Sequence, residues 1–341
     1  MSNKKTSIGG QALIEGIMMR GPKKDSMAVR KKDGSVEVFP MEIKSIKNKC
    51  FFFKWPIIRG VVGFIDSMLI GYKAMMQSAE KSGYLDEIEE TDDKKQNEET
   101  VEIEATEETT EKPEEKPEEK DEKKSSGALM TVIMIIAAVL AVVLCVGLFI
   151  YLPSLVFKGI NYLAGGRLTG WQALFEGVLK IIIFLGYMFA VSYMKDIKRV
   201  FSYHGAEHKT IFCYEAGLEL NVENVRKQKR FHPRCGTSFM ILMLIVSIFI
   251  TLIFDAIFPG LRKVLWLRTI IKLLLVPVIC GLGYELIKIC GRYDNFITRI
   301  IAAPGLWIQR ITVKEPDDSM IEVAIAAMQD VIPENEEDDK W

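Results

Sequence analysis

The sequence has little histidine and no regular spacing of cysteine, and these absences exclude several common protein classes. Of its 341 residues, three are histidine and six are cysteine. The cysteines lack the paired spacing of a disulfide framework, which argues against a small scaffold held together by disulfides. No uninterrupted apolar segment follows the lysines near Met1, so we expect no cleavable signal peptide. Membrane insertion would then be directed by the first spanning helix.

Charge is nearly balanced over the whole chain, at a formal net charge of −1, but it is strongly segregated. Residues 85–126 hold 19 acidic side chains, 7 lysines and almost no apolar side chains. Because such a tract cannot bury a core, we expect a disordered, self-repelling linker over 85–126. The acidic tract, the long apolar runs and the basic remainder together exclude a single soluble globule.

Four apolar runs predict transmembrane helices, at 127–152, 171–194, 237–256 and 264–287. Each run can cross about 30 Å of hydrocarbon at about 1.5 Å per residue. Arg268 and Lys272 enter the first turns of the fourth run, where we expect their long side chains to reach the membrane interface. The loop 195–236 holds nine Lys and Arg residues, whereas the loop between the first two runs holds two. The positive-inside rule therefore predicts that loop 195–236 and both termini face the cytosol.

The segment 57–84 is apolar except for Arg59, Asp66 and Lys73, which recur every seven residues. That spacing forms one narrow polar stripe on a helix, which is typical of an interfacial or re-entrant helix. A fifth helix buried among the others is the alternative. Residues 1–56 predict a Gly-rich loop followed by a β-hairpin around Lys32-Asp33-Gly34. The predicted fold is thus a mainly α, polytopic membrane helical bundle over 127–316, with a small N-terminal β-hairpin element and a cytosolic tail at 317–341 that contains a short helix.

All three histidines lie in two short motifs of the loop 195–236. The first motif, HGAEH at 204–208, would place two imidazoles one helical turn apart with a carboxylate beside them, in the order of the inverted zinc-peptidase motif. The second motif, HPRC at 232–235, offers an imidazole and a thiolate from one turn. Nitrogen and sulfur ligands favour Zn²⁺ over harder ions. We therefore predict a zinc site made by His204, His208, His232 and Cys235, with Glu207 as the general base.

Two simpler interpretations of these motifs stay open. The histidines can hydrogen-bond lipid phosphates or loop carbonyls while Cys235 packs at the start of a helix, or Cys235 can act as a thiol. If all four residues bind metal, the site is closed and structural. If only three bind, water can take the fourth position and the metal can activate it.

A second cluster of notable residues is the glycine-rich segment 8–22, in which four glycines frame Glu15 and Arg20. Glycine allows positive φ and the close approach of another backbone or of a ligand. Glu15 is therefore a second candidate catalytic residue, and a turn that packs under the hairpin is the alternative. The string Gly-Gly-Gln also occurs where peptidyl-tRNA is hydrolysed, but nothing else indicates a tRNA-shaped scaffold, and we expect no nucleic-acid partner.

Four strings resemble the signature blocks of the YqhQ-like family of bacterial multi-pass membrane proteins. They are GGQALIEGIMMRGP at 9–22, YHGAEHKT at 203–210, HPRCGTSF at 232–239 and PGLWIQR at 304–310. The resemblance covers nearly the whole chain apart from the acidic linker. It implies a metal-dependent enzyme of the bacterial cytoplasmic membrane and favours the five His, Glu and Cys residues of the two motifs, with Glu15 as a contributor. It implies neither a substrate nor a mechanism.

Three functions are compatible with these observations. The first is a zinc-dependent hydrolase that acts at the cytosolic membrane surface on a membrane-associated substrate. The second is a non-enzymatic factor for the assembly or insertion of membrane proteins, with a structural metal site. The third is a transporter. Four spans with few intramembrane charges give little sign of a substrate pathway, so a transporter would have to be a homo-oligomer. Membrane lipids are partners in every case, and other membrane proteins are partners in the second.

Overall fold

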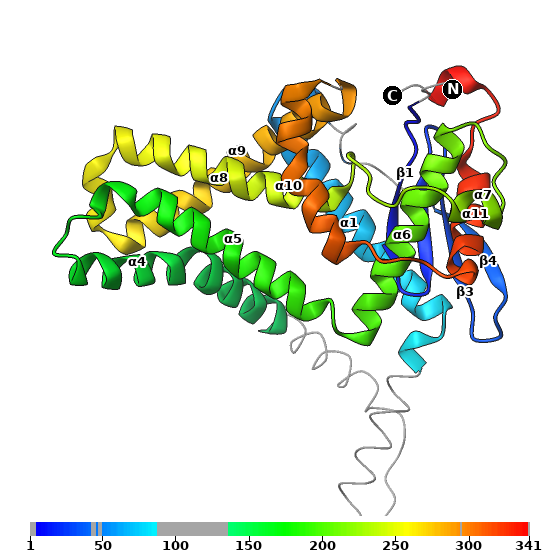
Figure 1. The fold of residues 1–341 in the computed structure, drawn as a ribbon, viewed down its shortest axis with the longest axis horizontal. Coiled ribbons are helices and arrows are strands. Elements are labelled where there is room, and N and C mark those ends of the chain that lie inside the picture. Colours follow the sequence, from blue (N-terminus) through cyan, green and yellow to red (C-terminus); the bar gives the residue numbers. More distant parts are fainter. Residues whose placement is uncertain (1–4, 42–45, 47–49, 87–135, 294, 340–341) are drawn as a thin grey trace, which may run out of the picture. The chain divides into compact units, whose positions relative to one another are not determined.

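The computed structural model describes residues 5–41, 46, 50–86, 136–293 and 295–339 (Figure 1). These residues fall into two units, one from the described parts of 1–86 and 177–341 and the other from residues 136–176. Almost all of the predicted acidic linker, and residues 127–135 of the first predicted span, lie outside the described residues. The first unit contains the sheet, most of the helices and every motif singled out above.

Four helices of the described residues are long and apolar enough to cross a membrane: Ile136–Leu163, Thr169–Val191, Gly236–Ile257 and Trp266–Arg292. They confirm the prediction of a mainly helical membrane protein. The first of them continues beyond residue 152 through α4 (Leu152–Leu163), after a π-helical turn at Gly147–Tyr151. This turn loosens the hydrogen-bond ladder just before Pro153, which has no N–H to donate, and the helix therefore continues past the proline.

The other three spans correspond to α5 (Gln172–Val191), α8 (Gly236–Ile257) and α9 (Leu265–Arg292). Short 3-10 turns precede α5 at Thr169–Trp171 and α9 at Pro259–Lys263. The expectation that the Arg268 side chain reaches the membrane interface is wrong. This side chain is 1% exposed, and its guanidinium donates to both carboxylate oxygens of Asp255 on α8. A buried charge is tolerated when a paired opposite charge replaces its water.

The N-terminal segment forms a four-stranded antiparallel sheet in the order β1-β2-β3-β4. Its strands are β1 (Gly9–Leu13), β2 (Gly16–Arg20), β3 (Asp25–Arg30) and β4 (Val36–Met41). The predicted hairpin is β3–β4, but the glycine-rich segment forms a second hairpin instead of a loop. Three of its four glycines, Gly10, Gly16 and Gly21, occur where other elements come close. A Cβ atom on Gly16 would lie 2.7 Å from the Ala28 carbonyl oxygen, and one on Gly21 would lie 2.5 Å from that of Val331.

Both faces of the sheet are covered. One face packs with α6 (Lys195–Glu215), α7 (Val222–Arg226) and α11 (Asp318–Val331) in a core that includes Ile17 and Met19. The other face packs against α1 (Ile58–Lys81), where Leu13 and Met18 contact Ile70 and Ala74. Figure 1 shows α6 and α11 beside the strands. The sheet therefore holds α6, which carries the HGAEH motif, in a fixed position.

Helix α1 is not among the four helices of the described chain that could span a membrane by length and composition. Its small residues approach α9 closely, since a Cβ on Gly60 would lie 2.8 Å from Cβ of Tyr284. Arg59 binds the carboxylate of Glu285 on α9, with Nε 2.7 Å from Oε1, and Asp66 is buried. Its exposed side chains include a row of apolar ones: Ile65, Met68, Leu69, Tyr72 and Met76.

Two further helices follow α9, and they connect the spans to the sheet. Helix α10 (Phe296–Thr312) begins with a capping box at Asn295 and packs on α8, with Ile308 and Ile241 in one core. Helix α11 forms where the apolar periodicity of the tail predicts a short helix. The described chain ends with a 3-10 turn at Glu336–Asp339, where Asp339 accepts a hydrogen bond of 2.5 Å from the Thr6 hydroxyl. Residues close to the two ends of the chain therefore contact each other.

Candidate metal centre

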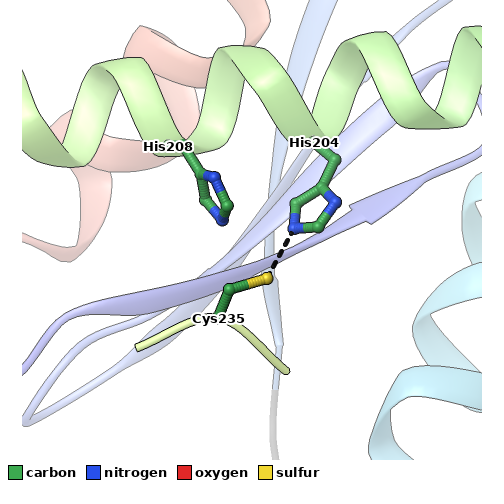
Figure 2. A group of neighbouring side chains, drawn as sticks. All are labelled: His204, His208 and Cys235. Atoms are coloured by element: carbon green, nitrogen blue, oxygen red, sulfur yellow. Dashed lines mark hydrogen bonds between the residues drawn. The ribbon is translucent and has the colours of Figure 1, made fainter. Parts of the chain in front are cut away.

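Three of the four predicted ligands come together at one point. The ligand atoms of His204, His208 and Cys235 all lie within 4.8 Å of one another, and Figure 2 shows the three side chains pointing toward one another. The histidines stand one turn apart on α6, with ring centroids 4.4 Å apart, and Cys235 is the residue just before α8. His208 and Cys235 are buried and His204 is half-buried. The spacing of the HGAEH motif thus produces the stacked pair that a helix predicts.

Backbone carbonyls fix the orientation of both imidazoles. Nδ1 of His204 lies 3.0 Å from the carbonyl oxygen of Thr312, and Nδ1 of His208 lies 2.6 Å from that of Arg230. Because a carbonyl can only accept, each Nδ1 carries the proton. In the neutral rings, Nε2 is then left with a lone pair. For His204, Nε2 lies 3.2 Å from the sulfur of Cys235. Histidine ligands of metals are held in this way by their outer hydrogen bonds.

His204 and Cys235 also shift each other's pKa values. Burial lowers the pKa of His204, but the neighbouring Cys235 thiolate outweighs this and raises it to about 9. Burial raises the pKa of the Cys235 thiol, but the two imidazoles hold it well below its ordinary value. Each group therefore favours the charged form of the other. Without a metal, the cluster is an imidazolium–thiolate pair at neutral pH.

His232, the fourth predicted ligand, is not part of this group. Its ring centroid is 5.6 Å from that of His208, but Nε2 faces the carboxylate of Glu215 at 3.8 Å and Nδ1 accepts from the Arg234 amide at 3.3 Å. Burial lowers the pKa of His232, against the opposing effect of Glu215. The ring is therefore held by a neighbouring ion pair, between Glu215 and Arg234, instead of by the cluster.

Glu207 lies on the same helix and packs against the edge of the sheet. A Cβ atom on Gly10 would lie 2.8 Å from Cγ of Glu207, so only glycine fits beside it on β1. Burial raises the pKa of Glu207, although the two imidazoles oppose this and the Gly10 amide donates a hydrogen bond to the carboxylate. A buried carboxyl group with a raised pKa is suited to transferring protons near neutral pH.

A pocket of about 410 Å³ opens beside the cluster. His204 and Glu207 line it from α6, while Ser67 of α1 and the first residues of α8 close other sides. The sheet contributes a set of residues from the glycine-rich segment: Gly10, Gln11, Ala12, Met18 and Arg20. The two regions that the sequence marks as notable therefore meet at one cavity.

Glu15, the second predicted catalytic residue, is not among the residues that line this pocket. It occupies the turn between β1 and β2 with a positive φ of 49°. Its carboxylate forms a two-pronged ion pair with the Arg199 guanidinium and accepts a hydrogen bond of 3.2 Å from the Tyr203 hydroxyl. Glu15 thus joins the first hairpin to the start of α6.

Gly205 is expected to be intolerant of any side chain, because the segment after α10 crosses α6 at this residue. A Cβ atom on Gly205 would lie 2.0 Å from the Lys314 carbonyl oxygen, which is backbone and cannot rotate away. Gly205→Ala should lower the free energy of unfolding by about 1–3 kcal/mol. It should also displace the Thr312 carbonyl that holds the His204 ring. Thermal unfolding of the detergent-solubilised protein measures this. Gly186→Ala, where the Cβ meets open space, is the matched control, and equal losses in the two variants would contradict the prediction.

Sequence reasoning missed the residues that hold the second motif in place. The buried side chain of Gln309 accepts from the His232 amide at 2.8 Å and donates to the His232 carbonyl at 2.8 Å, and it also donates to the Ser238 hydroxyl at 2.9 Å. Gly305 allows α10 to approach Ser238. Both lie in the PGLWIQR string, which marks the segment without indicating a role. The main-chain carbonyls of Thr312 and Arg230 leave no signal in the sequence, because every residue has a main-chain carbonyl.

Comparison with known proteins places the chain in a family. Residues 55–334 match the model of a family described as "Protein of unknown function (DUF1385)". The chain is 33% identical over 345 residues to "Uncharacterized protein YqhQ" of Bacillus subtilis (strain 168), in an alignment that covers 96% of this chain and 92% of that protein. No solved structure matches the chain significantly.

Proposed function

The chain belongs to the DUF1385 family of YqhQ-like proteins, and from its His/Cys cluster we propose that it is a zinc-dependent hydrolase of the bacterial cytoplasmic membrane. The observation that carries the proposal is the gathering of three ligand atoms within 4.8 Å, with both Nδ1 atoms bound to carbonyls. This arrangement leaves Nε2 of each ring and one sulfur available to a single ion.

The donor set supports zinc and an open coordination position. Two imidazole nitrogens and one thiolate suit a borderline-soft cation. Structural zinc sites use four protein ligands, whereas catalytic sites use three. Because His232 faces Glu215 and Arg234, the cluster has the three-ligand form. A bound zinc ion would act there as a Lewis acid on a substrate carbonyl and on water.

Glu207 supports a catalytic role for the site, because it shares the pocket with His204. In this proposal the carboxylate takes a proton from the attacking water and gives it to the leaving group. Its raised pKa makes the carboxylate a stronger base for the first half of that transfer. The Gly10 amide holds the carboxylate in place during the exchange.

The arrangement of the chain also supports a place at the membrane surface. Cys235 of the cluster directly precedes α8, one of the four candidate spans, so the site is close to where the chain would enter the bilayer. The bond between Thr6 and Asp339 agrees with two termini on one side, which we propose is the cytosol from the Lys and Arg distribution. The exposed apolar row on α1 would then contact lipid as an interfacial helix.

Elemental analysis of the detergent-solubilised protein tests the first half of the proposal. We expect about one zinc ion per chain after purification without added metal. A protein that is folded, yet free of zinc and unable to take it up, would overturn the proposal. The catalytic half is tested through Glu207, as argued below.

Zinc uptake by the metal-free protein should release about one proton per site near neutral pH. Cys235 already binds as thiolate because its pKa is depressed, whereas His204, with a pKa of about 9, must lose a proton from Nε2. The release should fall toward zero as the pH rises above about 9, and zinc affinity should weaken as the pH falls. Calorimetry in buffers of different ionisation enthalpy counts the protons. No release at neutral pH would contradict the protonated state of His204.

A further inference from the structure

Strand β1 is an edge strand that lies within the pocket. In the sheet order β1 has one neighbour, β2, and its other edge is free of strands in the described part of the chain. Three of its five residues, Gly10, Gln11 and Ala12, line the cavity beside His204 and Glu207. An edge strand presents a row of main-chain donors and acceptors that can pair with another extended chain.

The register of β1 determines which main-chain groups face outward. Successive residues of an antiparallel strand point their N–H and C=O groups to opposite sides. The Gly10 amide bonds Glu207 on α6 and therefore points away from β2. Ala12, two residues further on, points the same way. The Gly10 carbonyl and both main-chain groups of Ala12 are bonded to no residue of the described chain outside the strand.

The surroundings of β1 leave room for another chain. The cavity that Gly10, Gln11 and Ala12 line has a volume of about 410 Å³. Arg20 contacts Asp25 through Nε at 3.7 Å, and its two terminal nitrogens bind no other described residue. The hydroxyl of the exposed Ser67, which also lines the pocket, has no hydrogen-bond partner among the placed residues, and the side-chain amide of Gln11 lies against Gly71 of α1. These groups suit a ligand with both main-chain and side-chain polar atoms.

We propose that β1 binds an extended polypeptide segment as an added strand, so that the substrates of this site are peptide bonds in extended chain. Hydrogen bonds to the Gly10 carbonyl and to both main-chain groups of Ala12 would supply the affinity, and alternate side chains would face Arg20 and Ser67. The inference about cleavage rests on the proposed hydrolase function, whereas the docking itself needs no metal. Free phosphate or a lipid headgroup would leave the outward groups of Ala12 unused.

Cleavage at this site is an addition of water across the peptide C–N bond. The water oxygen bonds to the carbonyl carbon, and Glu207 takes one of its protons. The C–N bond breaks and Glu207 returns that proton to the departing nitrogen, which leaves as an amine. The other product is a carboxylic acid, which passes its remaining proton to the amine, so that a carboxylate and an ammonium group result and no oxidant, reductant or co-substrate is required.

The test measures binding separately from cleavage. Full-length Glu207→Gln protein in detergent micelles is screened against a synthetic library of random decapeptides, and the tightest peptide is then methylated at one main-chain nitrogen at a time. Methylation should weaken binding by about tenfold at every second position and have little effect between them, because only alternate amides face β1. A flat profile, or a library without binders, would overturn the docking proposal.

A pair of substitutions on α1 provides the matched control. Ser67 and Met68 are neighbouring exposed residues, and only Ser67 lines the pocket. Ser67→Trp should abolish binding of the selected peptide, whereas Met68→Trp should leave its dissociation constant within about twofold. Equal effects of the two would contradict the placement of the peptide.

The metal-free His208→Ala variant separates this inference from the hydrolase proposal. It should keep the period-two methylation profile while it loses cleavage. If wild-type protein binds peptides in this manner but cleaves none, docking stands and the hydrolase proposal fails. If it cleaves peptides without the alternating pattern, docking fails and the hydrolase proposal stands.

Discussion

Replacing His208 with alanine is expected to lower zinc affinity by more than about 100-fold and to leave the purified protein without bound metal. The substitution removes one of three ligand atoms, and neither Glu207 nor His232 is placed to take its position. The same change frees the Arg230 carbonyl from its hydrogen bond of 2.6 Å, so a modest loss of stability should accompany it. Elemental analysis gives the stoichiometry, and a competition titration with a chromogenic chelator gives the affinity.

His232→Ala is the matched control for this experiment. Its imidazole is buried close to His208 but faces Glu215 and Arg234, so zinc content should stay near one per chain. Loss of zinc from a folded His232→Ala protein would show that four residues bind, as the sequence alone predicts, and the site would then be closed. Full zinc retention in His208→Ala would contradict the cluster itself.

Replacing Glu207 with glutamine should reduce peptide cleavage by about 10²–10⁴-fold while zinc content and fold are unchanged. Glutamine keeps an oxygen that can accept from the Gly10 amide, but it cannot take and return a proton. Cleavage of the selected decapeptide is followed by mass spectrometry. In a non-enzymatic assembly factor with a structural metal, the same change should have almost no effect on function.

Glu15→Gln separates the two glutamates that the sequence offers as catalytic residues. Glu15 is bound to Arg199 and Tyr203 outside the pocket, so its substitution should lower the melting temperature more than the rate of cleavage. A loss of rate as large as that of Glu207→Gln, with unchanged metal and stability, would assign the proton transfer to Glu15 instead.

The sequence predicts features that depend on short-range periodicity. The four spans follow from uninterrupted apolar runs, and the stacked pair of His204 and His208 follows from the rise of a helix. Cys235 follows less directly, because nothing local says that the start of α8 lies beside α6. That position depends on Gln309, which comes from α10 and holds the turn of the second motif.

Two expectations from the sequence differ from the structure for physical reasons. Glycines usually mark turns, but Gly10 of β1 and Gly16 of β2 serve close packing against α6 and β3, so the loop expected over 8–22 is a hairpin. His232 shares the residue type of the other ligands, but its environment decides its orientation. Glu215 and Arg234 offer its ring nitrogens partners that composition and spacing do not predict.

The pair formed by Asp255 and Arg268 bears on how this protein enters the bilayer during synthesis. An arginine or an aspartate costs up to about 2.5–3.5 kcal/mol at the centre of a lone helix that the translocon releases into lipid, and less near a helix end. These two residues lie on either side of the short connection between α8 and α9, with both side chains almost fully enclosed. The two helices should therefore leave the translocon together as a preformed hairpin, because each carries the counter-ion that makes the other soluble in lipid.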